Sequence, residues 1–138
     1  MRSHRFLLLG LFLVLPTLAH AGNPHFIGTP TFTVNNNRLT ACGTIAGLGN
    51  GDVTIQLTAS GTLQCINRGG SPPPGQRFTA SGTVSNLNPK NGSLDFCVTT
   101  TAIQNPCPDQ MKFTATFTNT TLNVIQNGTT VLTASYQP

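Results

Sequence analysis

Apolar and polar residues alternate without a break over residues 53–65, V-T-I-Q-L-T-A-S-G-T-L-Q-C. Every odd position is apolar or small, and every even position is polar. A period of two is typical of a β-strand, in which successive side chains point to opposite faces of the sheet. The pattern therefore predicts a long strand with one buried face and one face toward water. Because this length is unusual for a single strand and Gly61 has no side chain to pack, we also expect a bulge or bend at Gly61.

Shorter segments with the same alternation follow one another along the chain, separated by runs of Asn, Gly and Pro that are typical of turns and loops. Asn127-Gly128 is a strong signal for a two-residue hairpin, because both residues tolerate positive φ. Residues 67–75 and 100–110 contain several prolines and are expected to be loops. The pattern predicts strands over residues 30–36, 38–45, 53–65, 77–85, 93–99, 111–118, 122–126 and 129–136.

These elements predict an all-β fold, because no helical periodicity occurs after residue 21. Antiparallel strands with alternating faces and short connections favour an antiparallel β-sandwich of eight or nine strands, immunoglobulin-like in the broad sense. An immunoglobulin domain proper is disfavoured, since the chain has no Trp to pack on a core disulfide.

The pentapeptide T-A-S-G-T occurs twice, at residues 58–62 and 79–83. A duplicated row of binding residues would explain the repeat. The favoured explanation is that a β-protein rich in Thr and Gly uses few residue types, so short sequences recur. In both copies the glycine, Gly61 or Gly82, falls on the inward face. We expect each glycine to make room for a bulky side chain, such as Phe, from the facing sheet.

The first 21 residues have the pattern of a secretory signal peptide. Arg2 and Arg5 precede an apolar run over residues 6–15, and Ala19-His20-Ala21 places small residues at the two positions that a signal peptidase reads. Cleavage is expected after Ala21. The apolar run is too short for a membrane anchor, because ten residues at about 1.5 Å each do not cross a core of about 30 Å. We therefore expect a secreted, extracellular or periplasmic protein with one domain over residues 22–138 and no membrane span.

Charge gives little indication of a partner. The segment 22–138 carries five cations and three carboxylates, and the cations are scattered along it. A nucleic-acid partner is not expected, because nucleic-acid binding requires a basic stripe. The charged residues of this segment are Arg38, Arg68, Arg77, Lys90, Lys112, Asp52, Asp95 and Asp109.

The four cysteines predict two disulfides in an exported chain of this size. Cys42 and Cys97 both fall on the outward face of their expected strands, whereas Cys65 lies at a strand end and Cys107 in a loop. Residues on the same face of neighbouring strands can reach bridging distance, which favours the pairs Cys42–Cys97 and Cys65–Cys107.

No catalytic, metal or cofactor site is expected. The cysteines lack the short paired spacing of a zinc site, and His25 is the only histidine after residue 21. The chain contains no Glu, its three Asp residues lie in different segments, and the G-x-S-x-G and P-loop motifs are absent. The sequence therefore predicts a protein that is not an enzyme.

Four short motifs resemble a family of short exported bacterial proteins of unknown function. They are N-P-H-F at residues 23–26, A-G-L-G at 46–49, C-I-N-R-G-G at 65–70 with prolines after it, and C-P at 107–108. The resemblance spans nearly all of residues 22–138 and brings no assigned activity. It implies that Cys65 and Cys107 are the usual two cysteines of the family, in agreement with their pairing, and that Cys42 and Cys97 are an additional pair.

Two functions from different classes follow from these observations. The first is a non-catalytic extracellular module, structural or adhesive, whose Thr-covered sheet faces and loops contact a cell-surface polysaccharide or an envelope protein. The second is a small carbohydrate-binding, lectin-like domain that uses the loops after Cys65 and around Pro106. The scarcity of exposed aromatic residues weakens the second, because sugar sites usually include an aromatic platform. Its candidate binding-loop residues are Asn67, Arg68, Gln76, Gln104 and Asn105.

Overall fold

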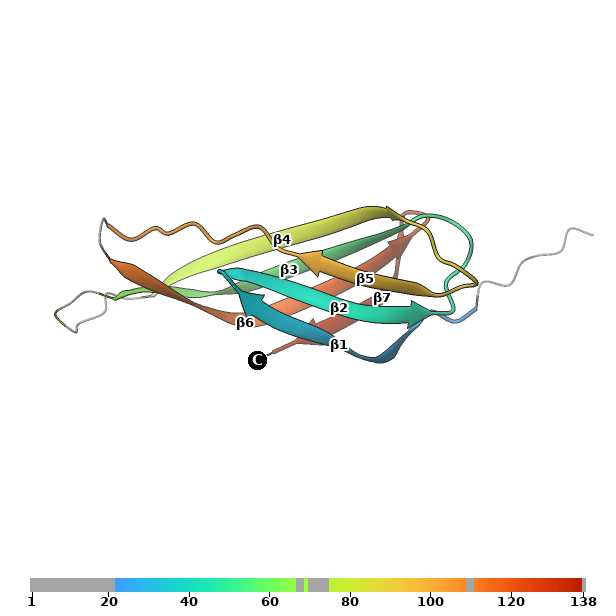
Figure 1. The fold of residues 1–138 in the computed structure, drawn as a ribbon, viewed down its shortest axis with the longest axis horizontal. Helices are drawn as coiled ribbons and strands as arrows, with labels where there is room; N and C mark the ends of the chain where they lie inside the picture. The colour runs from blue at the N-terminus through green and yellow to red at the C-terminus, as the bar shows by residue number, and fades with distance from the viewer. Residues whose placement is uncertain (1–21, 67–68, 70–74, 109–110, 138) are drawn as a thin grey trace, which may run out of the picture.

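The computed structural model describes residues 22–66, 69, 75–108 and 111–137. Within these residues the chain forms antiparallel strands and no helix (Figure 1). The strands are β1 (His25–Asn35), β2 (Arg38–Ala46), β3 (Val53–Ile66), β4 (Gln76–Leu87), β5 (Leu94–Thr99), β6 (Lys112–Gln126) and β7 (Thr129–Tyr136).

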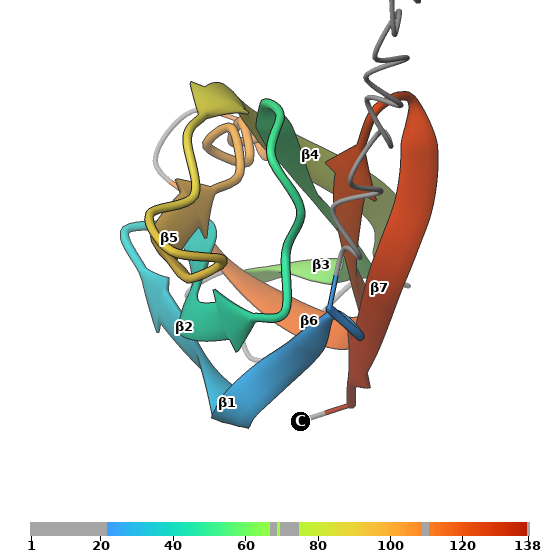
Figure 2. The same cartoon turned by 90° about the vertical axis from the view of Figure 1, so that its right-hand side faces the viewer.

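The strands form two sheets that face each other (Figure 2), which confirms the predicted all-β antiparallel sandwich. One sheet has the order β1-β2-β5 and the other the order β4-β3-β6-β7. In a constant-type immunoglobulin domain the fourth strand joins the sheet of the first, second and fifth strands. Here β4 pairs with β3 instead, so the division is three strands against four.

The predicted number of strands, eight or nine, is wrong, because the two strands predicted over residues 111–118 and 122–126 are parts of the single strand β6 (Lys112–Gln126). Ser60 pairs with Asn119 and Gly61 with Phe117, so Thr118 is an additional residue in β6. This bulge shifts the alternation: inward positions are odd up to Phe117 and even from Thr120 onward. The register irregularity therefore lies beside Gly61, as predicted, but the additional residue belongs to the partner strand.

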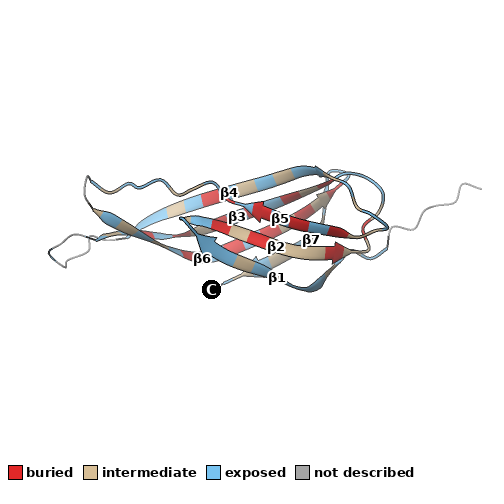
Figure 3. Ribbon diagram, viewed as in Figure 1, coloured by how far each residue is buried: buried red, intermediate tan, exposed pale blue. Residues whose placement is uncertain are grey.

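The alternation of β3 is confirmed by burial, since its odd positions from Val53 to Leu63 are buried and its even positions are half-buried or exposed. β3 lies between β4 and β6 and is the centre of the larger sheet. Buried positions alternate with half-buried or exposed ones along the strands (Figure 3), and the buried residues of both sheets form one core cluster. The core consists of Leu39, Ala41, Ile45, Leu48, Val53, Ile55, Leu57, Ala59, Leu94, Phe96, Val98, Phe117, Leu122 and Val124.

The first strand begins earlier than predicted, at His25 rather than residue 30. Its pairing with β2 is irregular between Ile27 and Thr31, where Gly28 has a φ of 72°. Before this irregularity Phe26 packs on the core, with its ring centroid 6.4 Å from that of Phe96. After it Val34 is 56% exposed.

Two tight turns join neighbouring strands through residues with positive φ. Asn36 and Asn37 connect β1 to β2 with φ of 49° and 58°. Asn127 and Gly128 connect β6 to β7 with φ of 52° and 74°. The second turn is the hairpin predicted from the Asn-Gly dipeptide, and it has the positive φ at both central residues that type I′ requires.

The two repeated glycines make room for different groups, and the expected Phe from the facing sheet is found at neither. A Cβ on Gly61 would collide with the carbonyl oxygen of Thr116 and would lie 2.8 Å from the ring of Phe78, both on neighbouring strands of the same sheet. A Cβ on Gly82 would collide with the backbone of Thr99, which belongs to the facing sheet. The second glycine therefore permits close approach of backbone rather than of a side chain.

A buried amide holds the loop between β2 and β3. Gln126, at the end of β6, is 6% exposed. Its Oε1 accepts a hydrogen bond from Gly49 N (3.2 Å), and its Nε2 donates to the carbonyls of Gly49 (2.8 Å) and Gly51 (3.1 Å). One side chain thereby satisfies three backbone groups of a glycine-rich loop that forms no ladder.

Replacing Gln126 by Met should lower the free energy of unfolding by about 1 to 3 kcal/mol, because Met has a similar length but leaves these backbone groups without partners. Chemical denaturation measures the change. The control is Gln56→Met on the exposed face of β3, which should change stability by less than about 0.5 kcal/mol. Equal effects of the two substitutions would contradict the assignment.

The predicted signal peptide, residues 1–21, lies outside the described residues. In the part of the chain that the structure describes, no helix has the length and apolar character needed to cross a membrane.

Candidate functional site

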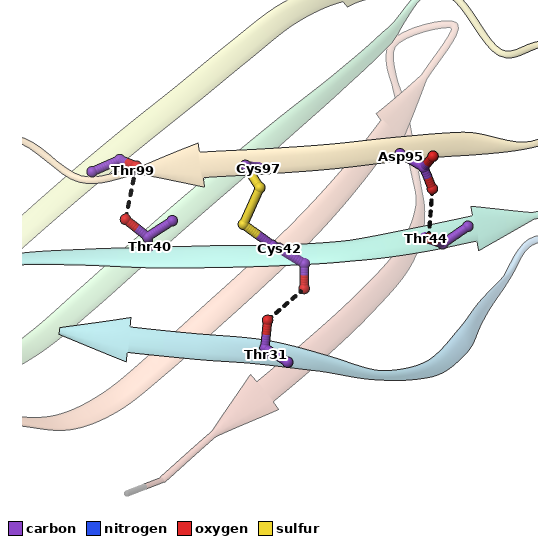
Figure 4. The surroundings of a disulfide bond; sticks show 7 residues. All are labelled: Thr31, Thr40, Cys42, Thr44, Asp95, Cys97 and Thr99. Carbon is purple, nitrogen blue, oxygen red and sulfur yellow. Dashed lines mark hydrogen bonds between the residues drawn. A yellow bond between two sulfur atoms is a disulfide. The ribbon is translucent and has the colours of Figure 1, made fainter.

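The two disulfides have the predicted pairing, Cys42–Cys97 and Cys65–Cys107. Cys42 and Cys97 lie directly opposite each other in the β2–β5 ladder, with their Cα atoms 4.2 Å apart. The bridge lies on the outward face of the smaller sheet, as the strand parity predicts (Figure 4).

Polar side-chain pairs flank this bridge along the same ladder (Figure 4). The hydroxyl oxygens of Thr40 and Thr99 are 2.8 Å apart, and Thr44 Oγ1 donates to Asp95 Oδ1 at 2.5 Å. The hydrogen-bonding groups of this face are thus largely paired with one another, which leaves few of them for a ligand.

The second bridge joins the end of β3 to the loop that leads from β5 to β6. The Cα atoms of Cys65 and Cys107 are 5.7 Å apart. In Figure 1 the strands β3, β4 and β6 continue to the left beyond β1, β2 and β5, and the β5–β6 loop runs along this projecting part. The bridge therefore fastens a long loop to the end of the sandwich where only the larger sheet continues.

The outer face of the larger sheet carries an array of neutral hydroxyl and amide groups. The register places these side chains in rows across the strands, about 4.8 Å apart between neighbouring strands and about 7 Å apart along each strand. All of them are exposed or half-buried. The rows are Thr83–Gln56–Asn123–Thr133, then Ser81–Thr58–Thr121–Ser135, then Thr79–Ser60–Asn119.

The bulge in β6 changes this array at its third row. In regular alternation Thr118 and Asn119 would point to opposite faces, but both are exposed and the next residue, Thr120, is buried. A bulge redirects side chains in this manner and increases the local twist of the strand. Two consecutive polar residues of β6 therefore lie on the outer face beside Ser60.

A hollow of about 400 Å³ lies at this point of the larger sheet. β3, β4 and β6 each contribute to its wall, and the polar lining side chains belong to the outer face. The lining residues are Ser60, Gly61, Thr62, Arg77, Phe78, Thr79, Thr118 and Asn119. We name it the bulge hollow.

Several hydrogen-bonding side chains line the bulge hollow. Thr118 Oγ1 already donates to the carbonyl of Ser60 at 3.4 Å, and Asn119 Oδ1 accepts from Gln137 Nε2 at 3.3 Å. The amide nitrogen of Asn119 and the hydroxyls of Ser60, Thr62 and Thr79 have no partner among the described residues, and neither does the guanidinium of Arg77. The hollow can therefore donate several hydrogen bonds to one ligand.

Two smaller hollows have a different character. One, of about 360 Å³, is lined by Val34, Ala115, Thr116 and Phe117 and lies where β6 continues beyond its pairing with β7. The other, of about 310 Å³, lies at the turn before β5. It is lined by Asn88, Lys90, Ser93, Leu94 and Asp95, so it holds one cation and one carboxylate.

The structure describes three of the five predicted binding-loop residues. Asn67 and Arg68 lie outside the described residues. Gln76 is exposed at the start of β4, and Gln104 and Asn105 are exposed in the β5–β6 loop. Asn105 Oδ1 accepts a hydrogen bond from Cys107 N at 2.9 Å, so its side chain supports its own loop.

The sequence did not indicate the residues of the bulge hollow. The hollow combines three strands, and their register cannot be read from the sequence. One signal was available: apolar positions change from odd at Phe117 to even at Leu122, and such a change within one strand requires a bulge. The sequence pattern was instead interpreted as two strands.

The described carboxylates and the described histidine, His25, lie far apart in the sequence. Within the described residues, no group of three or more His, Cys, Asp or Glu residues could hold a metal ion. His25 is exposed at the start of β1, and its Nδ1 lies 2.9 Å from the carbonyl oxygen of Asn23. Asp95 is bound to Thr44 on the smaller sheet.

No family model matches this chain, and no curated protein and no solved structure matches it either. The resemblance of its motifs to short exported bacterial proteins therefore stays an expectation from sequence.

Proposed function

We propose that this chain is a secreted, non-catalytic β-sandwich module, structural or adhesive, that contacts an extracellular surface through the outer face of the β4-β3-β6-β7 sheet. The array of neutral hydroxyl and amide groups on that face carries the proposal. Side chains of this kind exchange hydrogen bonds with hydrated polymers over a broad area, whereas an enzyme needs a few perturbed groups in a cleft.

Rigidity supports the proposal. A β-sheet holds its side chains at fixed spacing, and both disulfides restrain the chain around it. A prearranged surface loses less conformational entropy when it binds, so many weak contacts can add to a useful affinity. The smaller sheet is less suited to this role because Thr40, Thr44, Asp95 and Thr99 on its outer face are bound to one another.

The extracellular location is part of the proposal. Disulfides persist in oxidising compartments, and the two bridges agree with export by the predicted signal peptide.

Retention of the exported protein on envelope fragments and exopolysaccharide of the producing cells tests this function. We expect the variant Gln56→Ala/Thr58→Ala/Thr121→Ala, which truncates neighbouring groups of the array, to lose at least about tenfold in retention. The matched control is Thr33→Ala/Thr40→Ala/Thr99→Ala, which removes polar groups from the smaller sheet. Absence of retention, or equal losses in the two variants, would overturn the proposal.

A second candidate function is carbohydrate binding. The donor-rich bulge hollow favours it, and it would use the same sheet face rather than the loops expected from sequence.

A further inference from the structure

We infer that the bulge hollow binds a carboxylate-bearing sugar unit, such as a uronic acid residue of an acidic polysaccharide. This inference rests on the proposed function, because it assigns a ligand class to one part of the same contacting face.

The shape of the sheet at this point carries the first step. Over most of this face the strands pair in regular register. Here the additional residue Thr118 bends β6, and the surface forms a hollow of about 400 Å³. This volume suits one or two sugar units. A protein partner would need a far larger contact area. The hollow is therefore a local ligand site within a broader contact surface.

The charge of the hollow carries the second step. Among the described residues Arg77 is the one charged residue of its lining, and it pairs with Thr62 in the β3–β4 ladder. Neither described carboxylate lines it: Asp95 belongs to the smaller sheet, and Asp52 precedes β3 at the end opposite Ile66. A guanidinium binds a carboxylate through two parallel hydrogen bonds, so the charge complement of this hollow is a single carboxylate.

The neighbouring groups carry the third step. The hydroxyls of Ser60, Thr62 and Thr79 and the amide of Asn119 line the same hollow as Arg77. Hydroxyl groups donate and accept equally well, which matches the hydroxyls of a sugar ring. A nucleic acid or polyphosphate would need several cations along its backbone, and the described lining of this hollow provides one.

Binding of sodium polygalacturonate, with uncharged dextran of similar length as the neutral probe, tests the inference by isothermal titration calorimetry of the exported protein. We expect binding of polygalacturonate that weakens as salt is added, and no measurable binding of dextran. Arg77→Gln should weaken the binding about ten- to hundredfold, as expected when a hydrogen-bonded charge is lost. Thr62→Val should weaken it by a smaller factor, with the charge retained.

The control is Lys90→Gln, which removes the same charge from the turn before β5, outside the hollow. Equal losses for Arg77→Gln and Lys90→Gln would mean that net charge alone attracts the polymer, and this result would overturn the inference. Absence of polygalacturonate binding, or equal binding of dextran, would overturn it too. If envelope retention still depends on Gln56, Thr58 and Thr121 in that case, the proposed function stands and only the assigned ligand class fails.

Discussion

Removing the Cys42–Cys97 disulfide through the double substitution Cys42→Ala/Cys97→Ala is expected to lower the free energy of unfolding by about 4 kcal/mol. The two residues are separated by 55 positions, and a crosslink over a loop of this length restricts the unfolded chain by about that amount. The native ladder stays as it is, because Thr40–Thr99 and Thr44–Asp95 hold β2 to β5 on either side of the bridge. Nearly all of the effect therefore falls on the unfolded state.

Chemical denaturation of the double variant measures the loss, and hydrogen exchange of β2 and β5 tests whether the native ladder is retained. The comparison is Cys65→Ala/Cys107→Ala, whose separation of 42 predicts nearly the same restriction of the unfolded chain. We expect a smaller net loss, because residues 104–108 have no described hydrogen bond to a strand and gain freedom in the native state as well. A larger loss for this second pair would contradict the explanation.

Replacing Gly82 by Ala is expected to lower the free energy of unfolding by about 3 kcal/mol, at the upper end of the usual range for overpacking. The added Cβ would collide with the carbonyl group of Thr99 and lie 3.0 Å from Thr100 N. These are backbone atoms, which cannot move aside as the end of a side chain does. Their displacement would strain two backbone hydrogen bonds at the end of β5, both 2.9 Å long. Thr100 N donates to Leu39 O in one, and Thr101 N donates to Ser81 O of β4 in the other.

The matched control for Gly82→Ala is Gly75→Ala, just before β4. A Cβ at Gly75 would meet its nearest atoms at 3.4 Å or more, an ordinary contact, so this substitution should have little effect or stabilise slightly. Thermal unfolding of both variants measures the difference. If the two variants unfold at the same temperature, the close approach of β5 to β4 does not contribute to stability as described.

Alternation determined most of the fold in advance. The buried face of Val53–Cys65, the Asn127-Gly128 hairpin and the outward position of Cys42 all follow from neighbouring residues, because the two faces of a strand differ by a single position. The same rule failed between Phe117 and Leu122, where a bulge interrupts the alternation inside one strand. Local pattern cannot distinguish such a bulge from a turn between two strands.

The candidate site was less accessible from sequence than the fold. Arg77 and Thr62 become neighbours through the β3–β4 register, and Asn119 joins them through the β3–β6 register. The sequence pointed instead to polar residues in the proline-rich loops, since loops commonly carry binding residues. Composition contained no sign that the exposed face of a strand would be hollowed.

By itself, the sequence determined the fold class, most strand faces and the pairing of Cys42 with Cys97, because alternation states which side of a pleated strand a residue occupies. Only the tertiary structure decided the strand order, the position of β4 beside β3 and the different environments of Gly61 and Gly82. These depend on contacts between residues far apart in the chain. The bulge hollow belongs to the second group, since it exists only where three strands and one additional residue meet.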